Sequence, residues 1–269
     1  MSVVCTVAIA TYGVRIQEIA LPPTRSDLCY FVVWQAFEGP VPSSLIRPDV
    51  QVVRMMVKGL SRARNVALAQ VETPVVLLMD DDVALDAESV SQAAAAFLAS
   101  GATVGVADLL HGPEKALMHT RDHSWRPEAA LDMVASCEIF VCTQHIRALG
   151  VGFNPAFGAG SALYPLGEEN LFLYEAKVSG ASFTYLPYVL GWHPPVSSGL
   201  RDLGFPGLLA RARLTSTLFP RRRPWMRRVR QAYRDTHLGL WTRLRLALTP
   251  TPPVPPTRLS DVYDPSVCR

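Results

Sequence analysis

Several features that would assign this chain of 269 residues to a class of protein are missing. It holds no run of about 18 uninterrupted apolar residues, so no membrane-spanning helix is expected. Residues 1–10 lack a basic region and a cleavage site, so no signal peptide is expected either. The five cysteines form no C-x-x-C pair. Their odd number and mostly apolar neighbours indicate reduced thiols in a cytoplasmic protein.

Charged residues are also sparse, at 18%, whereas the hydrophobic content of 49% is ample for one large core. The most informative apolar stretch is 75–79, which follows Pro74 and predicts a buried strand of a parallel sheet. Three carboxylates, Asp80, Asp81 and Asp82, come where that strand should end. Adjacent like charges repel, and burial of a charge is costly without a partner, so this run predicts a bound cation.

The position of the three aspartates suggests what they bind. Alternate side chains of an extended segment share a side, so Asp80 and Asp82 are expected to point together and Asp81 away. Ligand sites of open α/β sheets lie at the carboxyl ends of strands, so the run is typical of a D-x-D site for a metal and a nucleotide. The alternative is an acidic turn that caps a helix beginning near Asp86, although a cap needs one aspartate and not three.

Strand and helix patterns alternate over the first hundred residues, which predicts a Rossmann-like, mostly parallel sheet flanked by helices. One of these helices covers 86–100 and is closed by Gly101. Residues 111–128 are polar and mixed, and predict a surface loop. The composition changes near Gly199, so we expect an α/β domain over residues 1–199. An arginine-rich helical appendage with a proline-rich tail is expected over residues 200–269.

Five motifs occur in a fixed order along the chain: Thr11-Tyr12 after the first strand, G-L-S-R-A-R-N at 59–65, the aspartates at 80–82, G-E-E-N at 167–170, and His193. This set resembles the family 2 glycosyltransferases, which have the GT-A fold. The likeness covers residues 3–195. It implies an inverting transfer of a sugar from a nucleotide-sugar donor, usually a UDP-sugar, to an acceptor nucleophile.

The resemblance implies that a divalent cation, Mn²⁺ or Mg²⁺, stabilises the departing nucleoside diphosphate. On the family pattern we assign Asp80 to the nucleotide and Asp82 to the metal. Asp81 is a rival for either role, and Asp80 is a further candidate metal ligand. His193, which follows the last predicted strand, completes the metal shell in many relatives. A structural histidine is the alternative.

The resemblance also places the nucleotide. Thr11 and Tyr12 would line the uridine, with Tyr12 as a stacking face, and a plain turn is the alternative. Arg64 and Asn65 match the part of the family motif near the nucleotide, where an arginine could bind the diphosphate in bidentate fashion. Otherwise they belong to an ordinary amphipathic helix. Gln35 stands where many members carry an aspartate that reads the base, so either its amide substitutes or the base preference differs.

The acceptor hydroxyl must lose a proton as it attacks the anomeric carbon. Family 2 enzymes use the second carboxylate of an E-D motif as the base, and that position falls on Glu169, with Glu168 as the competitor. Glutamate in place of aspartate lengthens the arm by one carbon. Taken alone, the pair could equally be acidic residues that the macrodipole favours at a helix N-terminus.

Eleven arginines lie between Arg211 and Arg245, with Asp235 as the only acid among them. Interleaved leucines and aromatics predict an amphipathic surface in peripheral contact with anionic lipid at the inner membrane face. Such a location suits a lipid-linked or polymeric acceptor. The alternative is a solvated helical pair packed on the core. Nucleic-acid binding favours the same interleaving but explains neither the aspartates nor the glutamate pair, so no nucleic-acid partner is expected.

Two other functions remain open. A sugar nucleotidyltransferase would share the sheet, but it usually has a glycine-rich phosphate loop after the first strand, where only Gly13 is found. A non-catalytic relative would bind a nucleotide-sugar without turnover.

Overall fold

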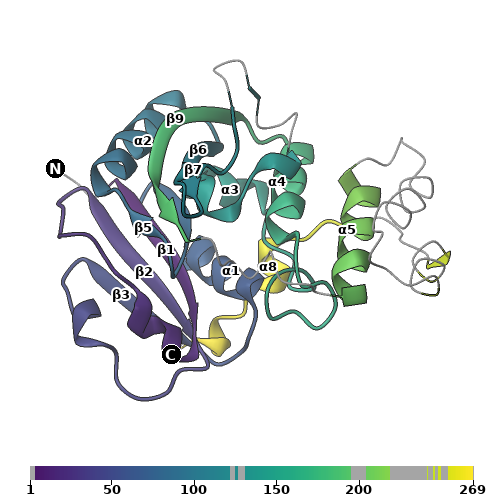
Figure 1. Ribbon diagram of the computed structural model, residues 1–269, viewed down its shortest axis with the longest axis horizontal. Helices are drawn as coiled ribbons and strands as arrows, with labels where there is room; N and C mark the ends of the chain where they lie inside the picture. The colour runs from purple at the N-terminus through teal and green to yellow at the C-terminus, as the bar shows by residue number, and fades with distance from the viewer. Residues whose placement is uncertain are drawn as a thin grey trace.

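The computed structural model describes residues 4–121, 125–126, 131–194, 204–218 and 254–268, together with 241, 245, 248 and 249. The strands of these residues form one sheet in the order β3-β2-β1-β4-β8-β6-β9-β5, with β7 paired to β6 (Figure 1). The strands are β1 (Cys5–Tyr12), β2 (Leu28–Gln35), β3 (Val50–Met55), β4 (Val75–Asp80), β5 (Ala84–Leu85), β6 (Val104–His111), β7 (Ala116–Leu117), β8 (Ile139–Cys142) and β9 (Phe183–His193). The α-helices are α1 (Leu60–Gln70), α2 (Ala87–Ser100), α3 (Thr143–Leu149), α4 (Glu168–Val178), α5 (Gly204–Leu218) and α8 (Leu259–Val262), and the 3-10 helices include η1 (Gly13–Glu18) and η5 (Ser136–Glu138).

The predicted alternation of strands and helices is confirmed. β1, β2, β3 and β4 pair in parallel, so their carboxyl ends meet at one edge of the sheet. β8 is antiparallel to both β4 and β6, and β6 is parallel to β9, so β9 also ends at that edge. The sheet is therefore mixed, with most of its long strands in one direction.

The N-terminal cap of α2 is Asp86, which comes after the three aspartates at 80–82. The Asp86 carboxylate accepts hydrogen bonds from the backbone N–H groups of Glu88 and Ser89, and Gly101 ends the helix in the left-handed conformation. None of the aspartates at 80–82 takes part in this cap, so capping does not account for them.

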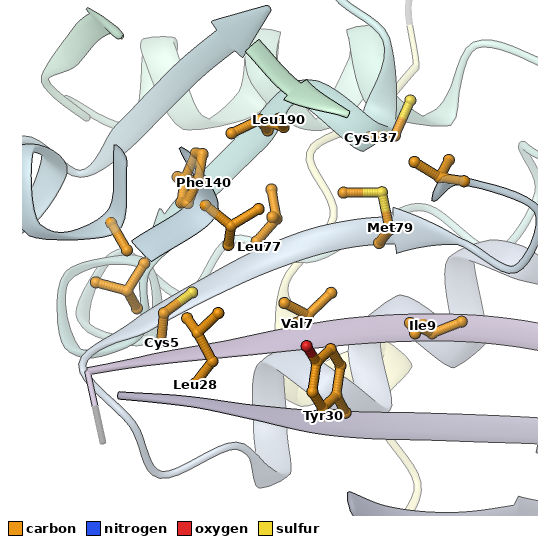
Figure 2. Close-up of a cluster of buried hydrophobic side chains, with 14 of the residues drawn as sticks. Cys5, Val7, Ile9, Leu28, Tyr30, Leu77, Met79, Cys137, Phe140 and Leu190 are labelled. Carbon is orange, nitrogen blue, oxygen red and sulfur yellow. The ribbon is translucent and has the colours of Figure 1, made fainter. Parts of the chain in front are cut away.

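Apolar side chains alternate along β1 between two cores on opposite faces of the sheet. Cys5, Val7 and Ile9 lie in one core with residues of β2, β4 and α2, and Figure 2 shows this cluster. Ala8 lies in the other core with residues of α1, α3 and α4. Because both faces are buried, the register of the strands is fixed, and so are the positions of the polar residues at their ends.

β5 and β9 bring the end of the acidic run toward His193, which is the last residue of β9 and does not lie beyond the strand. Their antiparallel pairing sets Leu85 opposite Gly191. Gly191 has a φ of 151°, and a Cβ there would overlap the carbonyl oxygen of Ala84. Only glycine permits so close an approach of the two backbones.

The end of the described chain returns to the core. α5 packs on α4, where Leu214 meets Leu171, and the C-terminal segment lies beside α1, in yellow in Figure 1. The backbone N–H and hydroxyl of Thr257 donate to the buried Glu175 carboxylate. Among the described helices, none has both the length and the apolar character needed to span a bilayer. Most of the arginine-rich segment and the boundary near Gly199 lie outside the described residues, so both stay predictions.

Candidate functional site

A cleft of ≈ 280 Å³ opens where the carboxyl ends of β1, β2, β4 and β9 meet. This is the edge at which open α/β sheets bind their ligands. The cleft brings together most of the predicted site residues with several that the sequence motifs did not indicate. Its lining consists of Ala10, Thr11, Tyr12, Arg15, Gln35, Lys58, Leu60, Asp80, Asp81, Asp82, Ala159, Gly160 and His193.

All three aspartates line this cleft, so the expected orientation of Asp81 away from the other two is wrong. β4 ends at Asp80, and beyond that point the alternation of an extended chain no longer applies. Asp81 is buried and accepts a hydrogen bond of 2.7 Å from the Thr11 hydroxyl. The Arg15 guanidinium binds both of its oxygens, with Nε 3.0 Å from Oδ2.

Asp82 faces His193 across a short gap. One Asp82 oxygen, Oδ2, accepts from Arg15 Nη2 at 3.1 Å. The other, Oδ1, is buried without a hydrogen-bond partner and lies 3.4 Å from His193 Nε2. His193 Nδ1 is 2.7 Å from the Pro194 carbonyl oxygen, which can only accept, so Nδ1 carries a proton. In the neutral imidazole, two acceptors therefore face each other, an arrangement that calls for a cation or a proton between them.

Arg64 connects the acidic run to α4. Its side chain is buried, and it donates to Glu168 at 2.9 Å and to Asp80 at 3.3 Å. Burial opposes its charge, but the carboxylates of Glu168 and Asp80 outweigh burial, so the pKa of Arg64 lies above its usual value. Burial raises the pKa of Asp80, against the effect of Arg64. Arg64 is not among the residues that line the cleft, and in this structure it binds carboxylates.

Glu168 and Glu169 begin α4. Burial and the neighbouring Glu168 carboxylate raise the pKa of Glu169 well above its ordinary value. Neither glutamate is among the described residues that line the cleft. A Cβ on Gly158 would lie 3.0 Å from the Glu168 carboxyl carbon, and the next two residues, Ala159 and Gly160, do line the cleft. Residues 158–160 therefore connect the surroundings of Glu168, at the start of α4, with the lining of the cleft.

Gln35 and Tyr12 line the cleft, and each side chain already contacts another residue of the protein. The Gln35 side-chain oxygen accepts a hydrogen bond of 2.7 Å from the backbone N–H of Gly59, so the amino group is the part left for a ligand. Tyr12 is 44% exposed, and Lys58 Nζ lies 4.6 Å from its ring centroid. A base that stacks on Tyr12 must use the other face of the ring or displace Lys58.

Asn65 is not brought to the cleft. Its side-chain amide exchanges two hydrogen bonds with the backbone of Phe153, of 2.8 and 2.7 Å, and so ties α1 to the chain after α3. The described part of 111–128 is exposed over 113–117, as a surface loop would be, but it also has a buried anchor. It contains β7 and the fully buried Arg121 side chain, which donates to both oxygens of Glu138 at 2.9 and 2.7 Å. This part of the chain is anchored in the core by a buried ion pair.

Arg15 and Lys58 line the cleft but were not predicted as site residues. Arg15 follows Tyr12 by three residues, in η1, and Lys58 directly precedes Gly59. A cation so close in sequence to each of two motifs for an anionic ligand is a pattern that would have indicated both.

The fit of a divalent cation depends on few protein atoms. Within the residues that the structure describes, no group of three or more His, Cys, Asp or Glu side chains is arranged to hold a metal ion. Asp82 Oδ1 and His193 Nε2 nonetheless fit as a pair of ligands, because both present unshared lone pairs at one point. Water and phosphate oxygens would have to complete such a shell, which is how Mg²⁺ is often bound at nucleotide sites.

Comparison with known proteins agrees with this architecture. Residues 43–153 match the model of the family described as Glycosyl transferase family 2. The fold is similar to the crystal structure of S. aureus TarS 1-349 in complex with UDP, with a TM-score of 0.54 and 15% identity over 91% of this chain and 69% of that one. The complex of TarS 1-349 with UDP-GlcNAc gives a TM-score of 0.57 and 14% identity, over 91% and 70%. No match is found among curated proteins.

The mixed sheet, with an acidic run at the end of β4 and a cleft at the carboxyl edge, has the fold of these TarS structures, which is the GT-A fold. This fold was predicted from the sequence. The family match includes α1, β4 and the aspartates at 80–82. The match of residues 43–153 to this family supports a glycosyltransferase.

Proposed function

We propose that the protein transfers a sugar, with inversion, from a UDP-sugar to an acceptor hydroxyl in a reaction that depends on Mn²⁺ or Mg²⁺. The observation that carries this proposal is the facing pair of Asp82 Oδ1 and His193 Nε2 inside the cleft. The TarS complexes with UDP and UDP-GlcNAc support UDP as the nucleotide.

On the donor side, Asp82 and His193 would hold the cation, which neutralises the negative charge that grows on the leaving diphosphate. Asp80 keeps its predicted role at the nucleotide, since its side chain is 32% exposed in the cleft. The Gln35 amino group offers N–H donors that suit the carbonyl oxygens of uracil. Thr11 positions Asp81 through its hydroxyl.

On the acceptor side, Glu169 would take the proton of the attacking hydroxyl. A bond forms between the acceptor oxygen and the anomeric carbon while the bond from that carbon to the diphosphate oxygen breaks. The raised pKa of Glu169 supports this role, because a carboxylate of higher pKa is a stronger base. The link from Asp80 through Arg64 to Glu168 supports it as well, since it holds the start of α4 at a fixed place relative to the acidic run.

Release of UDP from UDP-sugars in the presence of Mn²⁺ tests the proposal. Asp82→Ala is expected to abolish metal-dependent UDP binding. Glu169→Gln is expected to leave UDP binding intact and to lower transfer by roughly 10²–10⁴-fold. Glu88→Gln, an exposed carboxylate on α2, is the control and should change neither. Near-normal turnover by Glu169→Gln would exclude it as the base. Binding without turnover across many donors and acceptors would favour the non-catalytic relative.

For the acceptor, we propose a lipid-linked or polymeric molecule that the enzyme reaches while its arginine-rich segment contacts an anionic membrane. Co-sedimentation with anionic liposomes at low and high salt tests this contact. Binding is expected at low salt and should fall as salt screens the arginines. The same amount of protein pelleted with and without liposomes contradicts the membrane contact and leaves the transfer reaction unaffected.

A further inference from the structure

Arg15 is a cation among carboxylates that are predicted to hold a different cation. It binds both oxygens of Asp81, and its Nη2 also lies 3.1 Å from Asp82 Oδ2. The guanidinium therefore already supplies positive charge at the place where a metal would bind.

Arg15 and Arg64 both bind aspartates of the run at 80–82, but their side chains differ in burial. Arg64 is 3% exposed and lies between Glu168 and Asp80, so it cannot leave without stranding two carboxylates. Arg15 is 42% exposed, lines the cleft, and comes from η1 at the rim. It can turn toward a ligand in the cleft without disturbing buried packing, because a long exposed side chain changes rotamer at little cost.

We propose that Arg15 is a built-in counter-ion of the acidic run, which weakens divalent-cation binding to the empty cleft and makes it depend on an anionic ligand. While the cleft is empty, Arg15 occupies Asp82 Oδ2 and neutralises Asp81, so an incoming Mn²⁺ meets less negative charge. A diphosphate gives Arg15 a new bidentate partner and releases Asp82 to the metal.

Metal and nucleotide then bind with positive coupling. By linkage, UDP must strengthen Mn²⁺ binding by the same factor as Mn²⁺ strengthens UDP binding. This inference rests on the proposed function for the identity of the anion, but its effect on Mn²⁺ alone can be measured without nucleotide or sugar.

The experiment measures Mn²⁺ binding to the full chain by calorimetry and by the electron paramagnetic resonance signal of free Mn²⁺, with and without UDP. Arg15→Gln is expected to bind Mn²⁺ alone roughly tenfold more tightly than the wild type, the size of effect expected for one charge a few ångströms from the metal in a partly solvated site. UDP should strengthen Mn²⁺ binding less in Arg15→Gln than in the wild type. Arg15→Lys, which keeps the charge without the planar fork, should stay near the wild type.

Arg25 provides a matched control. It also binds both oxygens of one aspartate, Asp27, at 3.0 and 3.2 Å, and a second carboxylate, Glu88, at 2.7 Å, but it does not line the cleft. Arg25→Gln should leave the affinity for Mn²⁺ unchanged. Circular dichroism checks that each variant is folded, and Arg15→Ala is a second charge-removing variant with the same expected gain.

Unchanged or weaker Mn²⁺ binding in Arg15→Gln and Arg15→Ala overturns the inference, even if the wild type transfers sugar from a UDP-sugar. An equal gain in Arg25→Gln also overturns it, because the effect would then be one of overall charge. Tighter binding confined to the Arg15 variants supports it, even if no UDP-sugar is turned over and the proposed function fails. Absence of Mn²⁺ binding in all of these proteins overturns both the inference and the metal dependence.

Discussion

Among the clusters of arginine and carboxylate side chains in the described residues, the one around Arg121 is closed and the one at 80–82 is open. In the closed cluster, Arg121 and Glu138 have fully buried side chains. The Glu138 oxygens also meet the Ala135 N–H at 2.8 Å and His119 Nδ1 at 3.1 Å. In the open cluster at 80–82, one buried oxygen of Asp82 has no hydrogen-bond partner.

The difference teaches that the residue types in a charge cluster do not fix its role. Burial opposes the charge of Glu138, but His119 and Arg121 outweigh burial and lower its pKa, so it stays ionised as part of a rigid link. Burial raises the pKa of Asp80 in the open cluster. A cluster whose acceptors are all satisfied holds the fold together, and one with a buried acceptor that has no hydrogen-bond partner offers a place for a ligand.

Among the variants that test this contrast, Glu138→Ala is expected to have the largest effect on the free energy of unfolding. The substitution removes the carboxylate that binds both Nη atoms of the buried Arg121 and leaves Asp108 as its remaining counter-charge, so the free energy of unfolding should fall by about 3–5 kcal/mol. Urea denaturation measures the loss. Glu88→Gln removes a partner from an exposed ion pair and should leave the free energy of unfolding almost unchanged. A loss of similar size in both variants would mean that the closed cluster is not a structural link.

Glu175 sharpens the contrast, because the hydrogen bonds to its buried carboxylate come from a neutral residue, Thr257. Burial raises its pKa to about 7, although Thr257 opposes the shift. The folded protein therefore binds more protons than the unfolded chain between the usual value of 4.5 and about 7, and stability should fall as the pH rises through that window. The change should be about 1–3 kcal/mol.

Urea denaturation at about pH 5 and pH 8 measures this slope. Glu175→Gln should remove it, because glutamine does not titrate and can still accept from the Thr257 N–H. A slope of the same size in Glu175→Gln would assign the pH dependence to another group.

The smallest effect is expected for Asp82→Asn. It removes one of three repelling carboxylates and a partly exposed contact to Arg15, so the free energy of unfolding should change by less than about 1 kcal/mol. Stabilisation by Mn²⁺ with UDP should disappear. Thermal melting with and without these ligands measures both. A large loss of stability without ligand would class Asp82 with Glu138 as a structural residue.

The parts of the fold that were predictable have local signals. The strand at 75–79 is a continuous apolar run, and α2 is bounded by Asp86 and Gly101. Arg121 was expected in a surface loop because its neighbours in sequence are polar, whereas its partners Asp108 and Glu138 come from other elements. No local pattern contains that information.

The candidate site was predicted in its residues more than in its contacts. The aspartates, Thr11 and His193 do meet in one cleft. Arg64 was expected at the diphosphate, but it bridges Asp80 and Glu168, because the approach of α4 to α1 depends on packing that spans the whole chain. The predicted orientation of Asp81 was wrong because β4 ends at Asp80, and side chains alternate between the two sides only within the strand.

Because Gly191 has a hydrogen atom in place of a side chain, the two residues of the candidate cation site, Asp82 and His193, can lie close together. At Gly191 the bare α-carbon lets β5 lie against β9, and any larger residue would push Ala84, and with it the turn that carries Asp82, outward. A position that lines no part of the cleft thus acts as the spacer between Asp82 and His193. A side chain at position 191 would therefore change the separation of Asp82 and His193 without touching either residue.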